Sequence, residues 1–465
     1  MDIESNVAQL PPVNKKHGGL LRKIFIVIGI GVFLFFTLPY ILGIFTSDIS
    51  PIDDSDLIVD LGLPAPISDS ENAFLEIDQI SKLRVTKYDE DLVRSHLLGK
   101  TWDEVYVEEL IKENDQTFKL LDAASKKPKF QTPVREYIWD IAAFRQNIEL
   151  ASLRAIYLSK HGSGEEAAGE IFKLLDIGQK ILDYKQLNLV DFLLGEMTKR
   201  IGLETLQRLL IESGNLSSED LQVHALKLDS FTPDETGLNN YYKYLYTRTA
   251  VMIDALAIGD IDKLRELYPE FDFEGEFGLY GGYGTITSKR ESFYFRPNES
   301  KTLEADLIRT VLDGINSSCS SSTSGPSLLD KYKESLIDAT LLRSPIIFYF
   351  TENALGKLGH HIFTSSFVVG GITSTCSEEM LVGATKTVLL VKAYKVDNGV
   401  LPNDLGGLIS TYASEVPKDP YSGATFKYSP EKKIIYSVGS DRKDSGGSVG
   451  DDWRSMADPT FKIEF

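Results

Sequence analysis

The sequence predicts a mainly helical α+β protein with one N-terminal transmembrane helix and a small antiparallel sheet near the C-terminus. Three observations support this fold class. An uncharged apolar run lies near the N-terminus, apolar residues at helical spacing fill most of the chain, and two short β-branched and aromatic runs follow residue 424. With 465 residues, 42% of them hydrophobic, the chain can bury a large core, and we expect two or three structural units.

Residues 24–45 form the predicted transmembrane helix. They contain no charge, and at 1.5 Å per residue they extend about 33 Å, enough to cross the bilayer core. Basic residues precede this run within 1–23 and aspartates follow it, so the positive-inside rule places 1–23 in the cytoplasm and the rest of the chain outside it. A cleaved signal peptide is the alternative, but the run is longer than a typical signal and no small-x-small cleavage site follows. The lipid bilayer is therefore the predicted partner of 24–45.

The next part of the chain predicts a spacer and then helices. Residues 46–67 are rich in proline and aspartate, which is typical of a spacer between membrane and folded domain. Helical periodicity begins at Ser68, a candidate N-cap, and continues to residue 316 as an irregular helical array outside the cytoplasm. The break at 161–164 predicts a helical hairpin. Tyrosines at helical spacing between 241 and 246 indicate core packing.

The helical pattern is interrupted before it reaches the C-terminal module. Residues 271–294 are rich in glycine and aromatic residues and predict a surface loop, with a contact site for a protein partner as the alternative. Residues 317–327 are a serine-rich linker. Residues 328–377 predict a helical continuation, which Gly370 and Gly371 interrupt.

Residues 378–465 are predicted to form a C-terminal module of one helix, a hairpin and a polar loop. The helix covers 378–397 and ends where Gly399 permits a left-handed conformation. The runs 425–428 and 433–438 have the composition of paired strands. Residues 439–452, called the acidic loop below, are too polar and glycine-rich for a regular element.

Several short segments of this module share a pattern: N-G-V-L-P at 398–402, V-P-K-D-P-Y-S-G at 416–423, F-K-Y at 426–428, Y-S-V-G-S-D at 436–441, G-G at 446–447 and D-D at 451–452. Together they resemble the C-terminal half of the major pseudopilins of type II secretion. With F-R-P-N-E-S at 295–300 and N-A-L-G-K-L at 353–358, the chain is more similar still to a group of membrane-anchored bacterial proteins that append this module to a helical region. That group has no known activity. From the resemblance and the predicted topology we expect a non-enzymatic, single-pass protein of the bacterial inner membrane that presents this module outside the cytoplasm, as a binding or assembly component of a secretion-related system.

The acidic loop is the predicted metal site. Calcium takes about six to eight oxygen ligands, and the candidate ligands in the loop are Ser440, Asp441, Asp444, Asp451 and Asp452. The pseudopilin resemblance implies calcium here, because Asp441 and the 451–452 pair match the acidic positions of that family. Arg442 departs from the glycine that the family usually has, adding positive charge and restricting φ. A solvated acidic loop is the alternative.

Other signals in the sequence are weaker. A net charge of −19 without a clustered basic surface argues against nucleic acid as a partner. Residues 446–450 match G-x-S-x-G around Ser448, which makes an extracytoplasmic hydrolase the alternative function, although a strand-to-helix turn is not expected there. His360 and His361 are adjacent on a helix and point about 100° apart, so a structural role is favoured over a metal site. Cys319 and Cys376 either form a disulfide or stay free, and the sequence leaves both open.

Overall fold

The structure is a computed structural model of the chain. It describes residues 37, 47–61, 65–133, 139–184, 188–212, 216–232, 235–267, 291–316, 319–320, 351–447, 456–463 and 465. Most of these residues are helical and three short strands form one antiparallel sheet, which confirms the predicted mainly helical α+β class. Within the described part of the chain, no helix has both the length and the apolar character needed to cross a membrane. The predicted span 24–45 lies outside the described residues except for Thr37.

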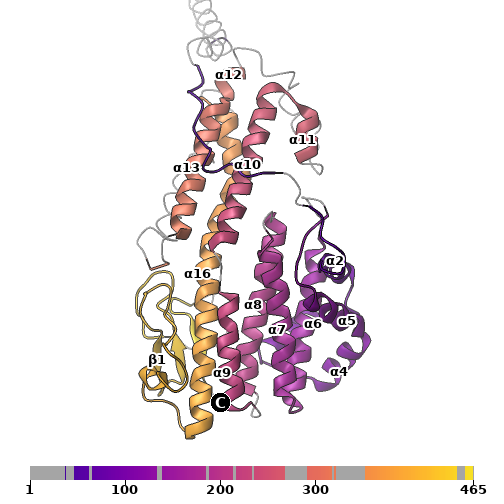
Figure 1. Ribbon diagram of the computed structural model, residues 1–465, viewed down its shortest axis with the longest axis vertical. Coiled ribbons are helices and arrows are strands. Elements are labelled where there is room, and N and C mark those ends of the chain that lie inside the picture. The colour runs from indigo at the N-terminus through magenta and orange to yellow at the C-terminus, as the bar shows by residue number, and fades with distance from the viewer. Residues whose placement is uncertain are drawn as a thin grey trace, which may run out of the picture.

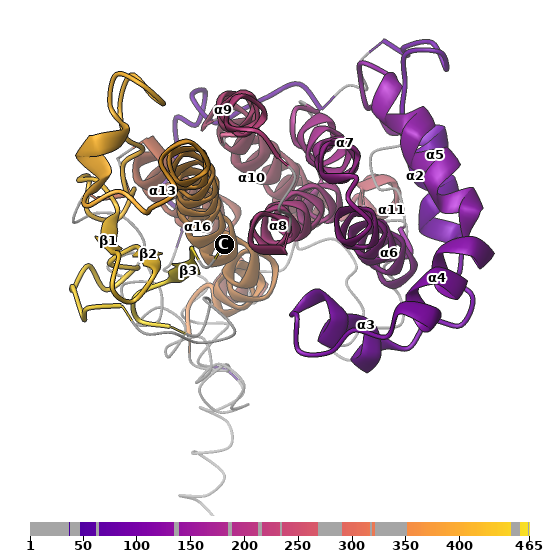
Figure 2. The ribbon, with the colours of Figure 1, turned by 90° about the horizontal axis from the view of Figure 1, so that it is seen from below.

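The helices are arranged in successive layers. The first group comprises α2 (Phe74–Lys82), α3 (Glu90–Leu97), α4 (Glu104–Glu113), α5 (Asp115–Lys126), α6 (Ile141–Lys160), α7 (Gly164–Leu182), α8 (Leu189–Glu212), α9 (Ser218–Lys227) and the 3-10 turn η1 (Leu228–Phe231). The second comprises α10 (Glu235–Ile258), α11 (Ile261–Leu267), α12 (Glu291–Tyr294), α13 (Pro297–Asn316), α16 (Ala354–Asn398) and the 3-10 turn η3 (Leu405–Leu408). Figure 2 shows the order of the layers, from α2–α5 on one side through α6–α9 to α16 and the sheet on the other.

Local sequence signals explain several helix ends. Asp140 caps α6 by accepting a hydrogen bond from the Ala143 N–H, and Ser217 forms a capping box with Asp220 at the start of α9. Gly162, at φ +84°, makes the turn between α6 and α7. The predicted helical hairpin with a break at 161–164 is therefore confirmed.

Helices α7 and α8 approach each other closely because two glycines face each other. A Cβ atom at Gly178 would lie 2.9 Å from the Gly195 carbonyl oxygen. A Cβ atom at Gly195 would lie 2.7 Å from Leu182 Cγ. The glycines thus remove the side-chain bulk that would hold the two backbones apart.

The longest helix, α16, has 45 residues and passes through the predicted boundary at 377/378. It begins after Asn353, at φ +53°, whereas the sequence predicted a helix from residue 378; it ends at Gly399, at φ +75°, as the sequence predicted. The predicted interruption at 370–371 is wrong, because the helix is continuous there. A glycine costs only about 1 kcal/mol in a helix interior, so two glycines between long helical flanks do not break it. Domains 328–377 and 378–465 therefore share one helix.

The sheet lies along the C-terminal half of α16. Its strands are β1 (Lys427–Ser429), β2 (Ile434–Tyr436) and β3 (Thr460–Lys462), in the order β1-β2-β3 with both pairs antiparallel. The β1–β2 hairpin confirms the prediction, whereas β3 was not expected. Ile435 pairs with Tyr428 on one side and with Phe461 on the other. Phe426 packs so closely on the helix that a Cβ atom at Gly383 would lie 3.1 Å from its ring.

The two upstream motifs, at 295–300 and 353–358, come together where α13 and α16 begin. The Asn353 side-chain oxygen accepts hydrogen bonds from Arg296 N at 2.9 Å and from Ser300 Oγ at 3.2 Å. A Cβ atom at Gly356 would lie 2.0 Å from Ser300 Oγ, so this position requires glycine. The motifs therefore join two helix N-termini.

The predicted spacer 46–67 is packed on the helical domain where it is described, at 47–61 and 65–67. Leu57 is fully buried. The Asp48 carboxylate accepts hydrogen bonds from the backbone N–H groups of Asn298 at 2.8 Å and Glu299 at 3.1 Å, in the first turn of α13. Figure 1 shows this segment running across α13 and α10. Proline and aspartate are typical of a solvated spacer, but here the carboxylate satisfies exposed helix N–H groups.

The structure also bears on the predicted tyrosine-rich face, on His360 and on the predicted loop and linker segments. Tyr241, Tyr242, Tyr244 and Tyr246 are buried, so the tyrosine-rich face is core as predicted. His360 Nδ1 lies 2.9 Å from Glu304 Oε1, in a structural contact. Of the predicted loop 271–294, only 291–294 are described, and they form α12. Of the predicted linker 317–327, only 319–320 are described.

Candidate functional site in the acidic loop

The base of the acidic loop is fixed by the buried Asp419, which lies in the V-P-K-D-P-Y-S-G segment at 416–423. Its Oδ1 accepts hydrogen bonds from Tyr421 N at 3.2 Å and Ser437 Oγ at 2.8 Å, and its Oδ2 accepts one from Val438 N at 3.2 Å. Asp419 is 1% exposed. A buried carboxylate needs hydrogen-bond donors in place of water, and these three groups supply them. It therefore joins the turn after Pro417 to the end of β2.

A second buried aspartate, Asp458, holds the middle of the loop. Its Oδ2 accepts hydrogen bonds from Ser445 N at 2.9 Å and Gly447 N at 2.8 Å. Gly447 has φ +62°, and a Cβ atom there would lie 2.9 Å from the Tyr436 ring. Glycine is thus required for the loop to turn over β2. Neither Asp419 nor Asp458 was among the predicted site residues.

Asp444 is engaged by protein groups. Its Oδ2 lies 3.0 Å from Lys427 Nζ, and its Oδ1 accepts hydrogen bonds from Gly446 N at 3.0 Å and Tyr436 OH at 3.2 Å. The hydrogen bond from Lys427, followed by that from Gly446, lowers the pKa of Asp444. Burial and the neighbouring Asp444 carboxylate raise the pKa of Tyr436. Of the predicted ligands, Asp444 is therefore already neutralised by a cation of the protein.

The remaining predicted ligands are only partly described. Ser440 and Asp441 are exposed, and Asp441 Oδ1 accepts a hydrogen bond from Lys443 N at 3.0 Å, which closes a turn over Arg442. Asp451 and Asp452 lie outside the described residues. Among the residues that the structure does place, no three His, Cys, Asp or Glu side chains form a group that could hold a metal. The structure thus gives Asp441 and Asp444 different partners within the loop, and it does not place Asp451 and Asp452.

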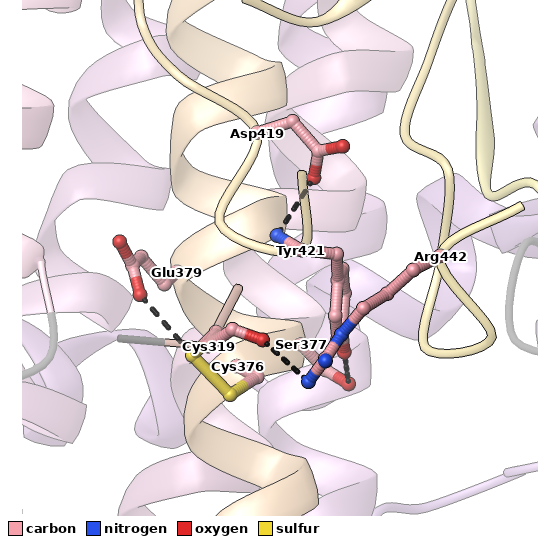
Figure 3. The surroundings of a disulfide bond; sticks show 7 residues. All are labelled: Cys319, Cys376, Ser377, Glu379, Asp419, Tyr421 and Arg442. Atoms are coloured by element: carbon pink, nitrogen blue, oxygen red, sulfur yellow. Dashed lines mark hydrogen bonds between the residues drawn. A yellow bond between two sulfur atoms is a disulfide. The ribbon is translucent and has the colours of Figure 1, made fainter. Parts of the chain in front are cut away.

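Cys319 and Cys376 form a disulfide with Cα atoms 5.8 Å apart, which resolves the alternative that the sequence left open. Figure 3 shows that the acidic loop reaches this bond through Arg442. Arg442 Nη2 donates a hydrogen bond to the Cys319 carbonyl oxygen at 3.2 Å. The Ser377 hydroxyl lies 3.2 Å from Tyr421 OH, beside the same bond. The disulfide therefore lies between α16 and two loops of the C-terminal module.

A buried charged pair was also missed by sequence reasoning. Lys199 on α8 forms an ion pair with Glu378 on α16 and donates a hydrogen bond to Gln179 Oε1 at 2.7 Å. A cavity of about 30 Å³ adjoins the pair, room for a single water. In the sequence, Lys199 and Glu378 each look like an ordinary charged residue on a solvated helix face. No sequence signal therefore identifies them as partners.

The histidine side chains that the structure describes contact other protein groups. Their ring nitrogens lie near Thr101 for His96, Glu104 for His161, Glu165 for His224 and Glu304 for His360. Ser448 itself lies outside the described residues. Gly446 and Gly447, which begin the G-x-S-x-G match, follow a loop rather than a strand. A nucleophile elbow requires the strand-to-helix turn.

No family model, no curated protein and no solved structure matches this chain.

Proposed function

We propose that this chain is a non-enzymatic, single-pass protein of the bacterial inner membrane that presents its pseudopilin-like C-terminal module outside the cytoplasm, as a binding or assembly component of a secretion-related system. The observation that supports this proposal is the course of α16. At 1.5 Å per residue, its 45 residues extend about 67 Å. One end is joined through Asn353 to the helix that Asp48 caps, close behind the predicted span, and the other end carries the sheet and the acidic loop.

Side chains from α8, α9 and η1 fix the C-terminal half of α16 at several levels. Gln207 Nε2 donates to Thr385 Oγ1 at 2.6 Å, Lys386 Nζ pairs with Asp229 at 2.5 Å and Ser218 Oγ donates to Asp397 at 2.7 Å. Together with the buried Lys199–Glu378 pair, these contacts orient the helix about its own axis. A module held in this way faces a partner with a fixed surface, which lowers the entropy cost of binding.

Calcium in the acidic loop is part of the proposal. Exposed carboxylate, hydroxyl and carbonyl oxygens are the ligands that calcium prefers, and Ser440 and Asp441 present them at the loop surface. The resemblance to the pseudopilins assigns Asp451 and Asp452 to the same ion. Asp444 contributes least, because Lys427 already neutralises it.

Site-specific photocrosslinking in cells tests the binding role. A photoreactive residue is introduced at Glu431 or Ser440, both exposed on the module, and at Val105, which is 70% exposed on the distant α4. We expect a discrete crosslinked species in the membrane fraction from the two module positions and none from Val105. Equal crosslinking at all three positions, or none at the module, would contradict a presenting role.

Two further measurements test the location and the enzyme alternative. Alkaline phosphatase fused after Phe465 should be active, because the positive-inside rule places the module outside the cytoplasm. An inactive phosphatase, with a fluorescent cytoplasmic reporter at the same place, would reverse the orientation. A serine-directed fluorophosphonate should not label the purified protein, and labelling that Ser448→Ala removes would favour a hydrolase.

A further inference from the structure

Arg442 has a backbone conformation that its side chain does not favour. Its φ is +56°, in the left-handed region where glycine is the usual residue. Strained residues of this kind persist only when surrounding contacts hold them, and they concentrate at functional sites. Among its contacts are the backbone hydrogen bond from Arg442 N to the Gly439 carbonyl oxygen at 3.1 Å and the side-chain hydrogen bond from Arg442 Nη2 to the Cys319 carbonyl oxygen at 3.2 Å. The side chain thus gives a reason for a non-glycine residue at this position.

The disulfide fixes the acceptor of this hydrogen bond. Cys319 is bonded to Cys376, which is 6% exposed within α16, so the Cys319 backbone is attached to the longest helix of the protein. The next residue, Ser320, adjoins the turn of the module, since a Cβ atom at Gly423 would lie 3.4 Å from its Oγ. Figure 3 shows the resulting sequence of contacts, from α16 through Cys319 to Arg442.

Arg442 is also attached to the candidate ligands. The backbone turn that Asp441 Oδ1 closes with Lys443 N spans Arg442, so a shift of this residue displaces the Asp441 carboxylate. Ser445 and Gly447, which follow in the same loop, are held by Asp458. The guanidinium of Arg442 lies at the Cys319 carbonyl oxygen, beside the disulfide.

We propose that Arg442 is a positioning residue that couples the Cys319–Cys376 disulfide to the conformation of residues 439–447, the described part of the acidic loop, and thereby to the affinity of its candidate ligands Ser440 and Asp441 for a divalent cation. The statement about affinity rests on the proposed calcium function, whereas the statement about conformation does not. The two are therefore measured separately.

Hydrogen exchange of the Ser445 and Gly447 amides in the full chain tests the conformational part. Loss of a hydrogen bond from a charged donor changes an equilibrium constant roughly tenfold. We therefore expect the exchange rate of both amides to rise about tenfold in Arg442→Ala and in the double variant Cys319→Ser, Cys376→Ser. The combined variant should exchange no faster than either alone, because both changes break one connection. Arg442→Lys should restore part of the protection. Arg442→Gly, which relieves the backbone strain, should still exchange faster than the wild type.

The matched control is Lys443→Ala, which removes the same charge from the neighbouring, exposed position. It should leave exchange at Ser445 and Gly447 unchanged. Titration of each variant with calcium chloride then tests the affinity. Simple electrostatics predicts equal gains in calcium affinity for Arg442→Ala and Lys443→Ala, whereas the coupling predicts that Arg442→Ala binds about tenfold more weakly than Lys443→Ala.

The exchange and calcium measurements distinguish the coupling through Arg442 from the calcium function. Equal exchange in Arg442→Ala and Lys443→Ala, or additive effects of Arg442→Ala and the serine pair, would overturn the coupling. Faster exchange in the Arg442 variants without calcium binding in any protein would support the coupling and overturn the calcium function. Calcium binding with equal affinity in the two alanine variants would leave the calcium function intact and overturn the link from Arg442 to affinity.

Discussion

Lys199 on α8 and Glu378 on α16 form an ion pair whose side chains are 0% and 5% exposed, respectively. The pair connects the helical array to the helix that carries the sheet. Removing two charges from water is costly, and the cost is recovered only when both partners are present. This pair therefore favours one register of α16 against α8.

Removing one partner should destabilise the protein strongly. Glu378→Leu leaves an uncompensated buried lysine, and we expect the free energy of unfolding to fall by about 3–5 kcal/mol. Adding Lys199→Met in the double variant should recover most of that loss, because apolar side chains of similar volume replace both charges. Chemical denaturation of the purified chain measures the difference. A double variant no more stable than Glu378→Leu would show that the pair is not the source of the effect.

The facing glycines of α7 and α8 predict opposite effects for the same substitution within one helix. Gly178→Ala places a Cβ atom 2.9 Å from the Gly195 carbonyl oxygen, and we expect a loss of about 1–3 kcal/mol from overpacking. Gly169→Ala, also in α7, meets no atom within 4 Å and should stabilise by roughly 0.5–1 kcal/mol because alanine is the better helix former. Thermal melts of the two variants measure both. Equal shifts in the same direction would exclude a close-packing role for Gly178.

Lys392 predicts a pH dependence at alkaline pH. It is 4% exposed, and its Nζ donates to the Leu210 carbonyl in the last turn of α8. Burial, and then the nearby Lys395, lower its pKa from 10.5 to about 8. Between these two values the unfolded chain binds more protons than the folded one, so the contribution of Lys392 to stability rises with pH. Below pH 8 the folded state bears the full cost of the buried charge.

The measurement is the difference in free energy of unfolding between the wild type and Lys392→Met. We expect the stability of the wild type relative to Lys392→Met to increase as pH rises from 8 to 10.5. Lys112→Met, at an exposed position on α4, is the control for the loss of one positive charge. A difference for Lys392→Met that does not change with pH would mean that Lys392 is solvated.

Calcium should raise the melting temperature of the full chain, and a chelator should lower it. Binding to the folded state alone stabilises by about 2.7 kcal/mol at a hundredfold excess over Kd. Magnesium should do less, since its octahedral geometry suits a flexible loop poorly. Asp441→Ala with Asp452→Ala should abolish the calcium effect, whereas Asp444→Asn should reduce it only slightly, because Lys427 already pairs with Asp444. Superimposed melting curves with calcium and with chelator would identify the loop as a solvated surface feature.

Local signals in the sequence were sufficient to predict the ends of those elements that one residue terminates. Gly399 ends α16 and Gly162 separates α6 from α7, because both positions require a positive φ. The β1–β2 hairpin followed from two short runs of β-branched and aromatic residues, at 425–428 and 433–438. In each case the physical cause lies within a few residues of its effect.

The missed features depend on distant partners. Strand β3 forms only because Phe461 pairs with Ile435, and a strand of three residues carries little pattern of its own. Asp419 and Asp458 look like ordinary turn residues until the loop that they hold is folded around them. Asp444 was a reasonable candidate ligand by charge alone, but Lys427, on a neighbouring strand, neutralises it.

The cap that Asp48 provides on α13 has a mechanical consequence. Asp48 follows Phe45, the last residue of the predicted span, by three residues, a tether of at most about 11 Å when fully extended. In the proposed topology, a tilt of the membrane-spanning helix would therefore be transmitted through Asp48 to α13, and through Asn353 to α16. With a lever arm of about 67 Å, a tilt of about 10° would sweep the acidic loop sideways by about 12 Å.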